Sequence, residues 1–180
     1  LLKDRRPDMM FYANRDAVRV NPRFVEMIIP VEWREEHKSK LKARETLKLT
    51  NHAVEQQKAT ILFPSGRIAY WANGRLNERP WKSSAVGLAR KYDLPILPVH
   101  MKARNSGLFY WLAKWSTELR DMTVFHELLN KKGDLFDFTI GNLIPPDQLE
   151  GDPVDVTRAL ERHTVHTLAN DENACFGRHF

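Results

Sequence analysis

Short apolar runs alternate with amphipathic stretches along the whole chain. Apolar runs that indicate β-strands lie at Met9–Asn14, Arg23–Val31, Thr60–Phe63, Ile96–Met101 and Leu135–Ile140. Stretches with helix-like spacing of apolar positions lie at Glu35–Lys58, Ser83–Tyr92, Leu108–Trp115, Phe125–Lys132 and Val154–Ala169. Strands that alternate with helices favour an α/β fold in which helices flank a sheet. The sequence contains no internal repeat and no clear linker, so we expect a single domain over residues 1–180.

The two longest amphipathic stretches predict which side chains face the core. In the first, residues 35–58, the apolar stripe consists of Ala43, Leu47, Thr50 and Val54. In the second, residues 154–169, it consists of Val156, Leu160 and Leu168. Side chains at this spacing lie on one side of a helix, so these positions are expected to be buried.

The segment after the third apolar run has the composition of a ligand-binding turn. It reads Phe63-Pro64-Ser65-Gly66-Arg67, and the predicted strand before it is expected to be buried. Glycine permits a positive φ and a close approach of ligand to backbone, whose free N–H groups can hold an anion. The guanidinium of Arg67 offers a fork of donors that suits a phosphate or a carboxylate. The turn is a candidate anion-binding corner, and a plain surface turn is the alternative.

Further basic groups follow this turn, at Arg75, Arg79, Lys82, Lys102 and Arg104. Lys82 stands at the start of a predicted helix, where an anion would also meet the positive end of the helix dipole. Arg104 and Asn105 come after the Ile96–Met101 strand, and ligands of open α/β sheets gather at the carboxyl ends of strands. Each charge alone is expected to be solvated, but their position after neighbouring strands favours a shared site.

Composition narrows the class of partner. The net charge of +5 and the isoelectric point of about 9.4 favour anionic partners such as phospholipid headgroups, phosphorylated substrates or nucleic acid. Four tryptophans fall within residues 71–115, which fits either a membrane interface or ordinary packing. The single Cys175 excludes an intrachain disulfide and a cysteine-rich metal site. No apolar run reaches the roughly 18 residues of a membrane span.

The histidines offer little evidence of catalysis. His163 and His166 have a spacing that suits a metal, but no third ligand is evident nearby, and we expect both to be solvated. His166 and Asp171 also form a His-x4-Asp pattern, at a chain end where helices fray. His100, at a strand end beside the candidate site, is more interesting, although a packed or exposed histidine is the simpler interpretation. No nucleophile elbow, Walker loop, dinucleotide fingerprint or carboxylate pair is present in the sequence.

Several short motifs follow one another along the chain. They are residues 28–32 with Arg34, the turn at residues 63–68, the helix-like residues 80–91 and the apolar run Leu-Pro-Ile-Leu-Pro-Val at residues 94–99. In this order they resemble the lysophospholipid acyltransferases of the 1-acyl-glycerol-3-phosphate acyltransferase type, which have four ordered blocks. Residues 28–34 resemble the second block, residues 63–68 look like the Phe-Pro-Glu-Gly-Thr-Arg turn of the third, and residues 94–99 look like the apolar strand of the last, with residues 80–91 as the helix between these two. The resemblance covers residues 8–142 and implies an acyltransferase-type fold with a mixed, mostly parallel sheet.

The chain departs from the family pattern at two places. Ser65 replaces the glutamate of the turn, and Ile68 occupies the usual arginine position while Arg67 stands one place early. The catalytic His-x4-Asp of the family would lie upstream of Leu1, and the start at Leu1-Leu2-Lys3 suggests an N-terminally truncated fragment. The order of the blocks rules out His166 and Asp171 as substitutes. We therefore assign no catalytic residue in this chain and expect the fragment to be inactive alone.

The resemblance implies an acyl transfer from acyl-CoA or acyl-carrier protein to the hydroxyl of a lysolipid such as 1-acyl-glycerol-3-phosphate, without a cofactor or a metal. Substrate binding would fall to Phe63, Pro64, Ser65, Gly66, Arg67, Lys82, Arg104 and Asn105. The expected partners are a lysophospholipid acceptor, an acyl thioester and the membrane surface, at the cytoplasmic face of the cell membrane. Phe109, Tyr110, Trp111 and Trp115 are candidates for contact with the bilayer, or for core packing.

The identity of the acceptor and the activity itself each leave an alternative open. The acceptor is either a phospholipid precursor or, as in divergent branches of the family, a lyso-ornithine-type lipid. A non-catalytic lipid- or anion-binding module is the rival function. A nucleic-acid-binding domain rests on the isoelectric point alone, no reader motif supports it, and we expect no nucleic acid partner.

Overall fold

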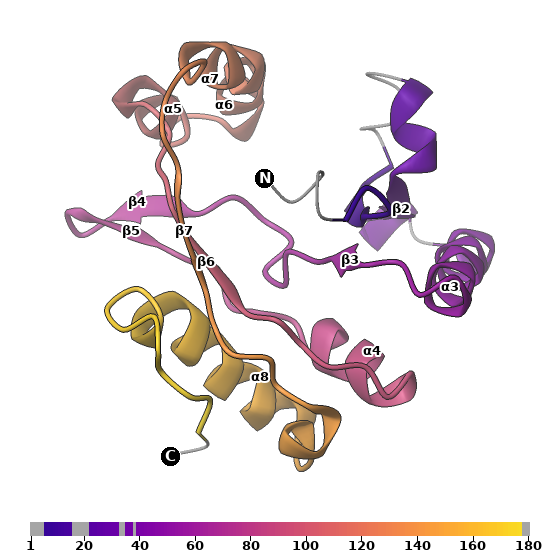
Figure 1. The fold of residues 1–180 in the computed structure, drawn as a ribbon. Coiled ribbons are helices and arrows are strands. Elements are labelled where there is room, and N and C mark those ends of the chain that lie inside the picture. The colour runs from indigo at the N-terminus through magenta and orange to yellow at the C-terminus, as the bar shows by residue number, and fades with distance from the viewer. Residues whose placement is uncertain (1–5, 16–21, 33–34, 38, 178–180) are drawn as a thin grey trace. The chain divides into compact units, whose positions relative to one another are not determined.

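A computed structural model describes residues 6–15, 22–32, 35–37 and 39–177 (Figure 1). Its contacts divide the chain into two compact units, residues 1–66 and residues 67–180, and each is described by itself. The expectation of a single domain over residues 1–180 stays a prediction.

Unit 1 is a small parallel sheet with one long helix. The sheet has the order β2-β1-β3, formed by β1 (Met10–Asn14), β2 (Ile28–Val31) and β3 (Thr60–Ile61). Short 3-10 turns at Pro22–Glu26 and Glu35–His37 lie before and after β2, and α3 (Lys40–Glu55) leads into β3. Parallel strands need a crossover connection, and α3 supplies it between β2 and β3.

The buried face of α3 differs from the predicted stripe. Ala43 and Leu47 are exposed, while Thr50 and Ala53 are buried. The reason is a set of polar contacts with the sheet: Thr46 Oγ1 donates to the Pro30 carbonyl at 2.6 Å, and Thr50 Oγ1 lies 3.0 Å from the hydroxyl of Tyr12. Thr50 is buried as predicted, whereas Thr46, which the predicted stripe does not include, faces the sheet in place of Leu47.

Unit 2 contains two antiparallel pairs of strands. The first is a hairpin of β4 (Tyr70–Ala72) and β5 (Arg75–Asn77), in a stretch where the apolar pattern predicts no strand. Its turn residues Asn73 and Gly74 have φ of 52° and 71°, and Asn-Gly is the usual sequence of such a two-residue turn. The second pair is β6 (Val99–Lys102) with β7 (Asp137–Ile140).

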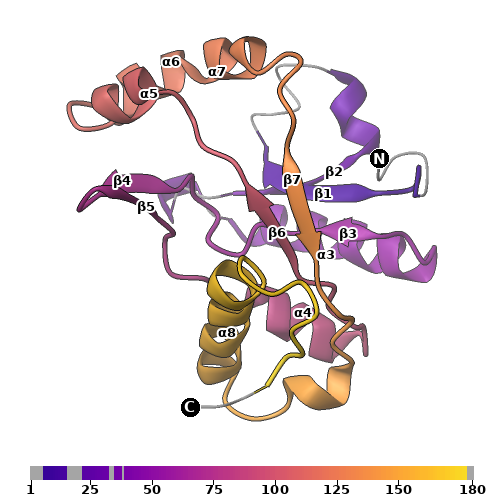
Figure 2. The ribbon, with the colours of Figure 1, turned by 60° about the vertical axis from the view of Figure 1, so that its left-hand side comes forward.

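The helices of unit 2 lie at both ends of the β6–β7 pair. At one end are α4 (Ser84–Lys91) and α8 (Pro153–Arg162), and at the other are α5 (Gly107–Leu112), α6 (Thr117–Met122) and α7 (Val124–Asn130) (Figures 1 and 2). A short 3-10 turn, Pro146–Leu149, leads into α8, and a π-helical turn, His163–Thr167, follows it. The predicted helices therefore exist, with shorter bounds.

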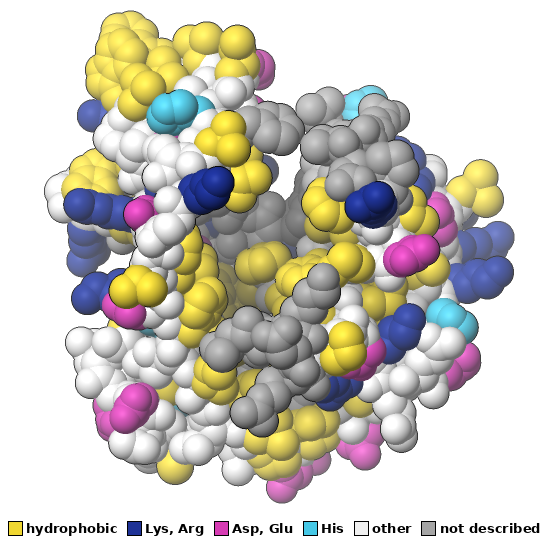
Figure 3. Space-filling model, turned by 45° about the horizontal axis from the view of Figure 1, so that its top comes forward, with side chains coloured by type: hydrophobic (Ala, Val, Ile, Leu, Met, Phe, Trp, Pro, Cys, Tyr) yellow, Lys and Arg dark blue, Asp and Glu magenta, His cyan; other side chains and the backbone are white. Residues whose placement is uncertain are grey.

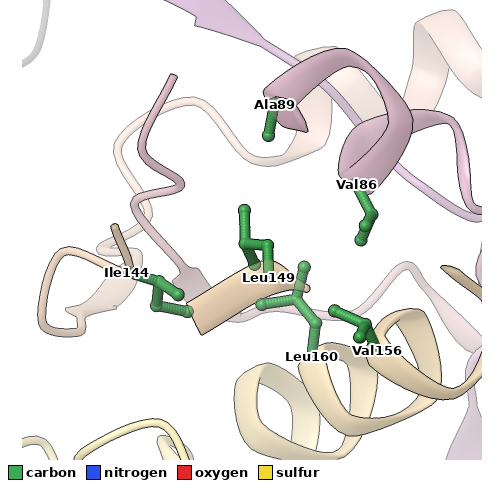
Figure 4. Close-up of a cluster of buried hydrophobic side chains, with 6 residues drawn as sticks. All are labelled: Val86, Ala89, Ile144, Leu149, Val156 and Leu160. Atoms are coloured by element: carbon green, nitrogen blue, oxygen red, sulfur yellow. The ribbon is translucent and has the colours of Figure 1, made fainter. Parts of the chain in front are cut away.

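The core of unit 2 lies between α4 and α8. It consists of Val86, Ala89, Ile144, Leu149, Val156 and Leu160 (Figure 4). Leu168, after the π-helical turn, is 1% exposed, so the stripe predicted for the last helix is buried as expected. Sequence periodicity succeeded here because this helix packs its apolar stripe into the core.

The α/β class is confirmed, but a single, mostly parallel sheet is not what the described residues form. The strands of the described residues make three small sheets, and among these strands parallel pairing occurs only in unit 1. β6 and β7 pair antiparallel because the chain between them returns through α5, α6 and α7 to the same end of the ribbon. Ile96, predicted as part of the β6 strand, instead forms an isolated bridge with Ile144.

Candidate functional site

The proposed anion-binding turn closes unit 1. The Gly66 N–H donates to the Phe63 carbonyl at 2.9 Å, so the four residues form a β-turn with Pro64 at its second position. Gly66 has a φ of 62°, a conformation that glycine adopts without steric cost. Ser65 is buried and Phe63 is exposed. The tight turn is confirmed, and its role in binding stays a prediction.

The strand before this turn is shorter and more exposed than expected. β3 ends at Ile61, and both Thr60 and Phe63 are exposed. Phe63 therefore contributes an exposed ring beside the glycine turn rather than a core side chain. A ring in this position suits contact with an apolar ligand.

Arg67 and Lys82 are exposed side chains of unit 2. Lys82 stands two residues before α4, next to Trp81, which packs against the core between α4 and α8. The Trp81 N–H donates to a carboxylate oxygen of Glu161 at 3.1 Å, which ties the entrance of α4 to α8. Lys82 is thus held at the start of a helix, as the sequence predicts.

Arg104 and Asn105 lie between β6 and α5, at the other end of the ribbon from α4 (Figures 1 and 2). The Asn105 N–H donates to the Tyr110 hydroxyl at 3.2 Å, and the Tyr110 ring lies 5.9 Å from the ring of Trp71 in β4. The structure therefore brings the segment after β6 against the hairpin. Arg104 is exposed beside it. Membership of Lys82, Arg104 and Asn105 in one site stays a prediction.

The hairpin carries basic groups close to aromatic rings. The guanidinium of Arg79 lies 4.1 Å from the centre of the Tyr70 ring, within the range of a cation–π interaction. Arg75 is exposed on β5, and Lys102 on β6 lies in register with Asp137 of β7. His100, half-buried on β6, lies in register with Thr139.

A buried carboxylate that the sequence analysis missed fixes the start of α5. Glu127 of α7 is 4% exposed and accepts hydrogen bonds from the Ser106 N–H at 2.7 Å and the Ser106 hydroxyl at 2.5 Å. Burial alone would raise the pKa of Glu127, but the bonds from Ser106 and the ion pair with Lys131 together lower it. Ser106 directly follows the candidate residues Arg104 and Asn105. By holding Ser106, Glu127 of α7 therefore helps to position these two residues. Serine before a helix is a common N-cap, but no local pattern links Ser106 to Glu127.

His163 is buried, contrary to the expectation of a solvated residue. It is 5% exposed, its Nε2 atom has no hydrogen-bond partner among the described residues, and its ring packs edge-on against Phe176 at 5.5 Å. Burial lowers the pKa of the imidazole. His166, on the same π-helical turn, is exposed. Within the described part of the chain, no three His, Cys, Asp or Glu side chains gather as metal ligands. Arg34 of the second block lies outside the described residues.

Comparison with known proteins identifies related sequences. The family model described as "Acyltransferase" matches residues 1–102, more than half of the chain. The lyso-glycine lipid O-acyltransferase of Phocaeicola vulgatus is 25% identical over 115 residues, which is 61% of this chain and 41% of the relative. The protein of the same name from Bacteroides thetaiotaomicron is 24% identical over 115 residues, 61% of this chain and 42% of the relative. The matched segment thus spans about two fifths of these relatives. No solved structure matches.

Proposed function

The chain belongs to the acyltransferase family, and we propose that it forms part of an enzyme that moves a fatty acyl group onto the hydroxyl of a lysolipid. The resemblance inferred from the turn and strand motifs is confirmed at the level of the family. Two relatives named as lipid O-acyltransferases support a lipid acceptor and an ester product. The observation that carries the proposal is the family match over residues 1–102, which includes the Phe63–Arg67 turn.

We further propose that the acceptor is a lysolipid with an amino-acid headgroup, rather than 1-acyl-glycerol-3-phosphate. Both relatives carry the name lyso-glycine lipid O-acyltransferase. A glycine joined through its nitrogen presents one carboxylate, which a single guanidinium binds with two parallel hydrogen bonds. Exposed Arg67, directly after the glycine turn, is suited to this role. A phosphate monoester carries more negative charge than a carboxylate. Because Ile68 occupies the family's usual arginine position and Arg67 stands one place early, we expect this turn to bind a phosphate monoester less well.

The proposed reaction is a direct transfer. The acceptor oxygen forms a bond to the carbonyl carbon of an acyl thioester, either acyl-CoA or acyl-carrier protein, and the carbon–sulfur bond breaks. The hydroxyl proton passes to a general base and then to the departing thiolate, so no oxidant or cofactor is consumed. The family resemblance implies that this base is a histidine oriented by an aspartate of a His-x4-Asp block, and we assign neither role to a residue of this chain.

We propose separate roles for the other candidate residues. Phe63 offers an exposed ring to the acyl chain, Pro64 and Ser65 shape the turn, and Gly66 offers close approach to the backbone. Lys82, before α4, and Arg104 with Asn105, at the opposite end of the β6–β7 pair, are each proposed to contact a charged group of the substrate or of the thioester carrier. We propose the cytoplasmic face of the cell membrane as the place of the reaction.

The test is an acyl-transfer assay on the complete gene product with a radiolabelled long-chain thioester. We expect ester formation with lyso-glycine lipid at a kcat/KM at least about tenfold above that with 1-acyl-glycerol-3-phosphate, since loss of one charge-matched contact costs about 1.5–3 kcal/mol. Arg67→Ala is expected to lower kcat/KM for lyso-glycine lipid by a similar factor. Arg44→Ala, an exposed arginine of α3 that belongs to none of the proposed sites, serves as the matched control.

Two results would contradict the proposal. Transfer to neither acceptor by the complete protein would favour a non-catalytic lipid- or anion-binding module. Equal losses in the Arg67 and Arg44 variants would show that general positive charge, rather than a specific contact, holds the acceptor.

A further inference from the structure

The segment from α5 to α7, residues 107–136, exposes large apolar side chains that a water-facing surface rarely collects. Trp115 is 74% exposed, Met122 is 77% exposed and Leu135 is 96% exposed. The other exposed members are Leu108, Trp111, Leu119, Val124, Leu128, Leu129 and Phe136. Figure 3 shows hydrophobic side chains gathered at the upper left of the molecule, where these helices lie. We call residues 107–136 the apolar helical segment.

Other side chains of the apolar helical segment are buried and hold it in place. Phe109 and Tyr110 are buried and pack edge-on with ring centres 5.3 Å apart, so the sequence-based alternative of core packing is correct for these two. Trp111 and Trp115 instead lie against each other, 6.2 Å apart, on the exposed side. The apolar helical segment thus combines two buried aromatic side chains with a series of exposed apolar ones.

The charge of the apolar helical segment is balanced, although the chain as a whole carries +5. Its four cationic residues, Lys114, Arg120, Lys131 and Lys132, match four acidic ones, Glu118, Asp121, Glu127 and Asp134. Arg120 pairs with Asp121 at 2.6 Å and Lys131 with Glu127 at 3.3 Å, so part of this charge is neutralised within the segment. A surface without net charge gains little electrostatic attraction from an anionic lipid or a nucleic acid. It can contact a zwitterionic surface without electrostatic cost.

We propose that the apolar helical segment binds the surface of a zwitterionic lipid bilayer, with its exposed side chains inserted between the headgroups. This inference rests on the proposed function, because a lysolipid acceptor reaches the enzyme from a membrane. Tryptophan favours such an interface, since its ring is apolar and its N–H is polar. Helices of six and seven residues extend about 10 Å, so they lie in the interface. No helix among the described residues has the length and apolar character of a membrane span.

The test is flotation of the 180-residue chain with phosphatidylcholine vesicles, without lysolipid or thioester. We expect binding that persists in about 0.5 M NaCl, where the Debye length falls to roughly 4 Å and surface charges are screened. Leu129→Glu and Met122→Glu are each expected to lower the partition coefficient about tenfold, since an inserted apolar side chain is worth roughly 1.5 kcal/mol or more. Leu41→Glu is the matched control, because Leu41 is 77% exposed on α3 of unit 1.

Circular dichroism verifies that each variant is folded before flotation. The proposal is overturned if the parent chain does not float with phosphatidylcholine, or if binding requires anionic lipid and disappears in salt. It is also overturned if the Leu41 variant loses as much binding as the Leu129 variant. Light scattering that detects a dimer, lost on Leu129→Glu while flotation is unchanged, would assign the surface to a second copy. Because no substrate is present, failure here is distinct from failure of the proposed acyl transfer.

Discussion

Replacement of Glu127 by alanine is the perturbation whose cost follows most directly from the structure. The buried carboxylate accepts two hydrogen bonds from Ser106 and pairs with Lys131. Alanine leaves the Ser106 N–H without this acceptor, and an unsatisfied buried donor costs about 1–3 kcal/mol. Lys131 is partly exposed, so water replaces the lost ion pair at small cost. We expect the unfolding free energy of the α5–α7 region to fall by about 2–4 kcal/mol.

Hydrogen exchange of the backbone amides in residues 107–136 measures this loss locally, and urea unfolding of the 180-residue chain measures it globally. Glu127→Gln keeps one carbonyl acceptor and is expected to retain about half of the stability that alanine removes. Glu118→Ala, an exposed carboxylate in the neighbouring helix, is the control, with an expected change below about 0.5 kcal/mol. A Glu127→Ala variant with exchange rates like those of the parent would refute the assigned role of this carboxylate.

The lowered pKa of Glu127 adds a pH dependence with a definite sign. The unfolded chain binds the proton more tightly than the folded one, so ionised Glu127 stabilises the fold above the ordinary carboxyl range near 4.5. This contribution disappears as the pH falls through the folded-state pKa. The parent chain should lose exchange protection in α5–α7 below about pH 4 more steeply than Glu127→Gln.

Two further predictions concern unit 2. A Cβ atom on Gly141 would lie 2.8 Å from Leu168 Cδ1 and 3.1 Å from Pro98 Cγ, so Gly141→Ala should destabilise the protein by about 1–3 kcal/mol. Gly87→Ala, in a helix and with open space around it, should raise the melting temperature. Equal melting temperatures of the two variants would contradict this prediction. Burial lowers the pKa of His163, so the unfolded state binds more protons and stability should fall as the pH drops below about 6.5. A His163→Phe variant should show a smaller drop in urea midpoint between pH 7 and pH 5, and an identical drop would exclude this histidine as the cause.

Several features of this protein follow from the sequence by itself. Glycine and proline punctuation predicts the tight turn at Phe63–Gly66, since the chain has few other conformations available there. Apolar periodicity predicts α4 and the buried stripe of α8, because both helices are held by apolar packing in the core of Figure 4. The order of short motifs predicts the acyltransferase family, which the match over residues 1–102 confirms.

Tertiary structure alone decided how these elements pair and which polar groups are buried. α3 presents Thr46 rather than Leu47 to its sheet, where the Thr46 hydroxyl donates to the Pro30 carbonyl, a contact that the apolar stripe does not predict. Glu127 acts on Ser106 across 21 residues of chain, a distance that no local pattern spans. The exposure of Trp111 next to buried Tyr110 likewise depends on which neighbours the fold brings close. Apolar periodicity indicates which side of a single helix or strand is apolar, whereas residues distant in sequence determine what that side packs against.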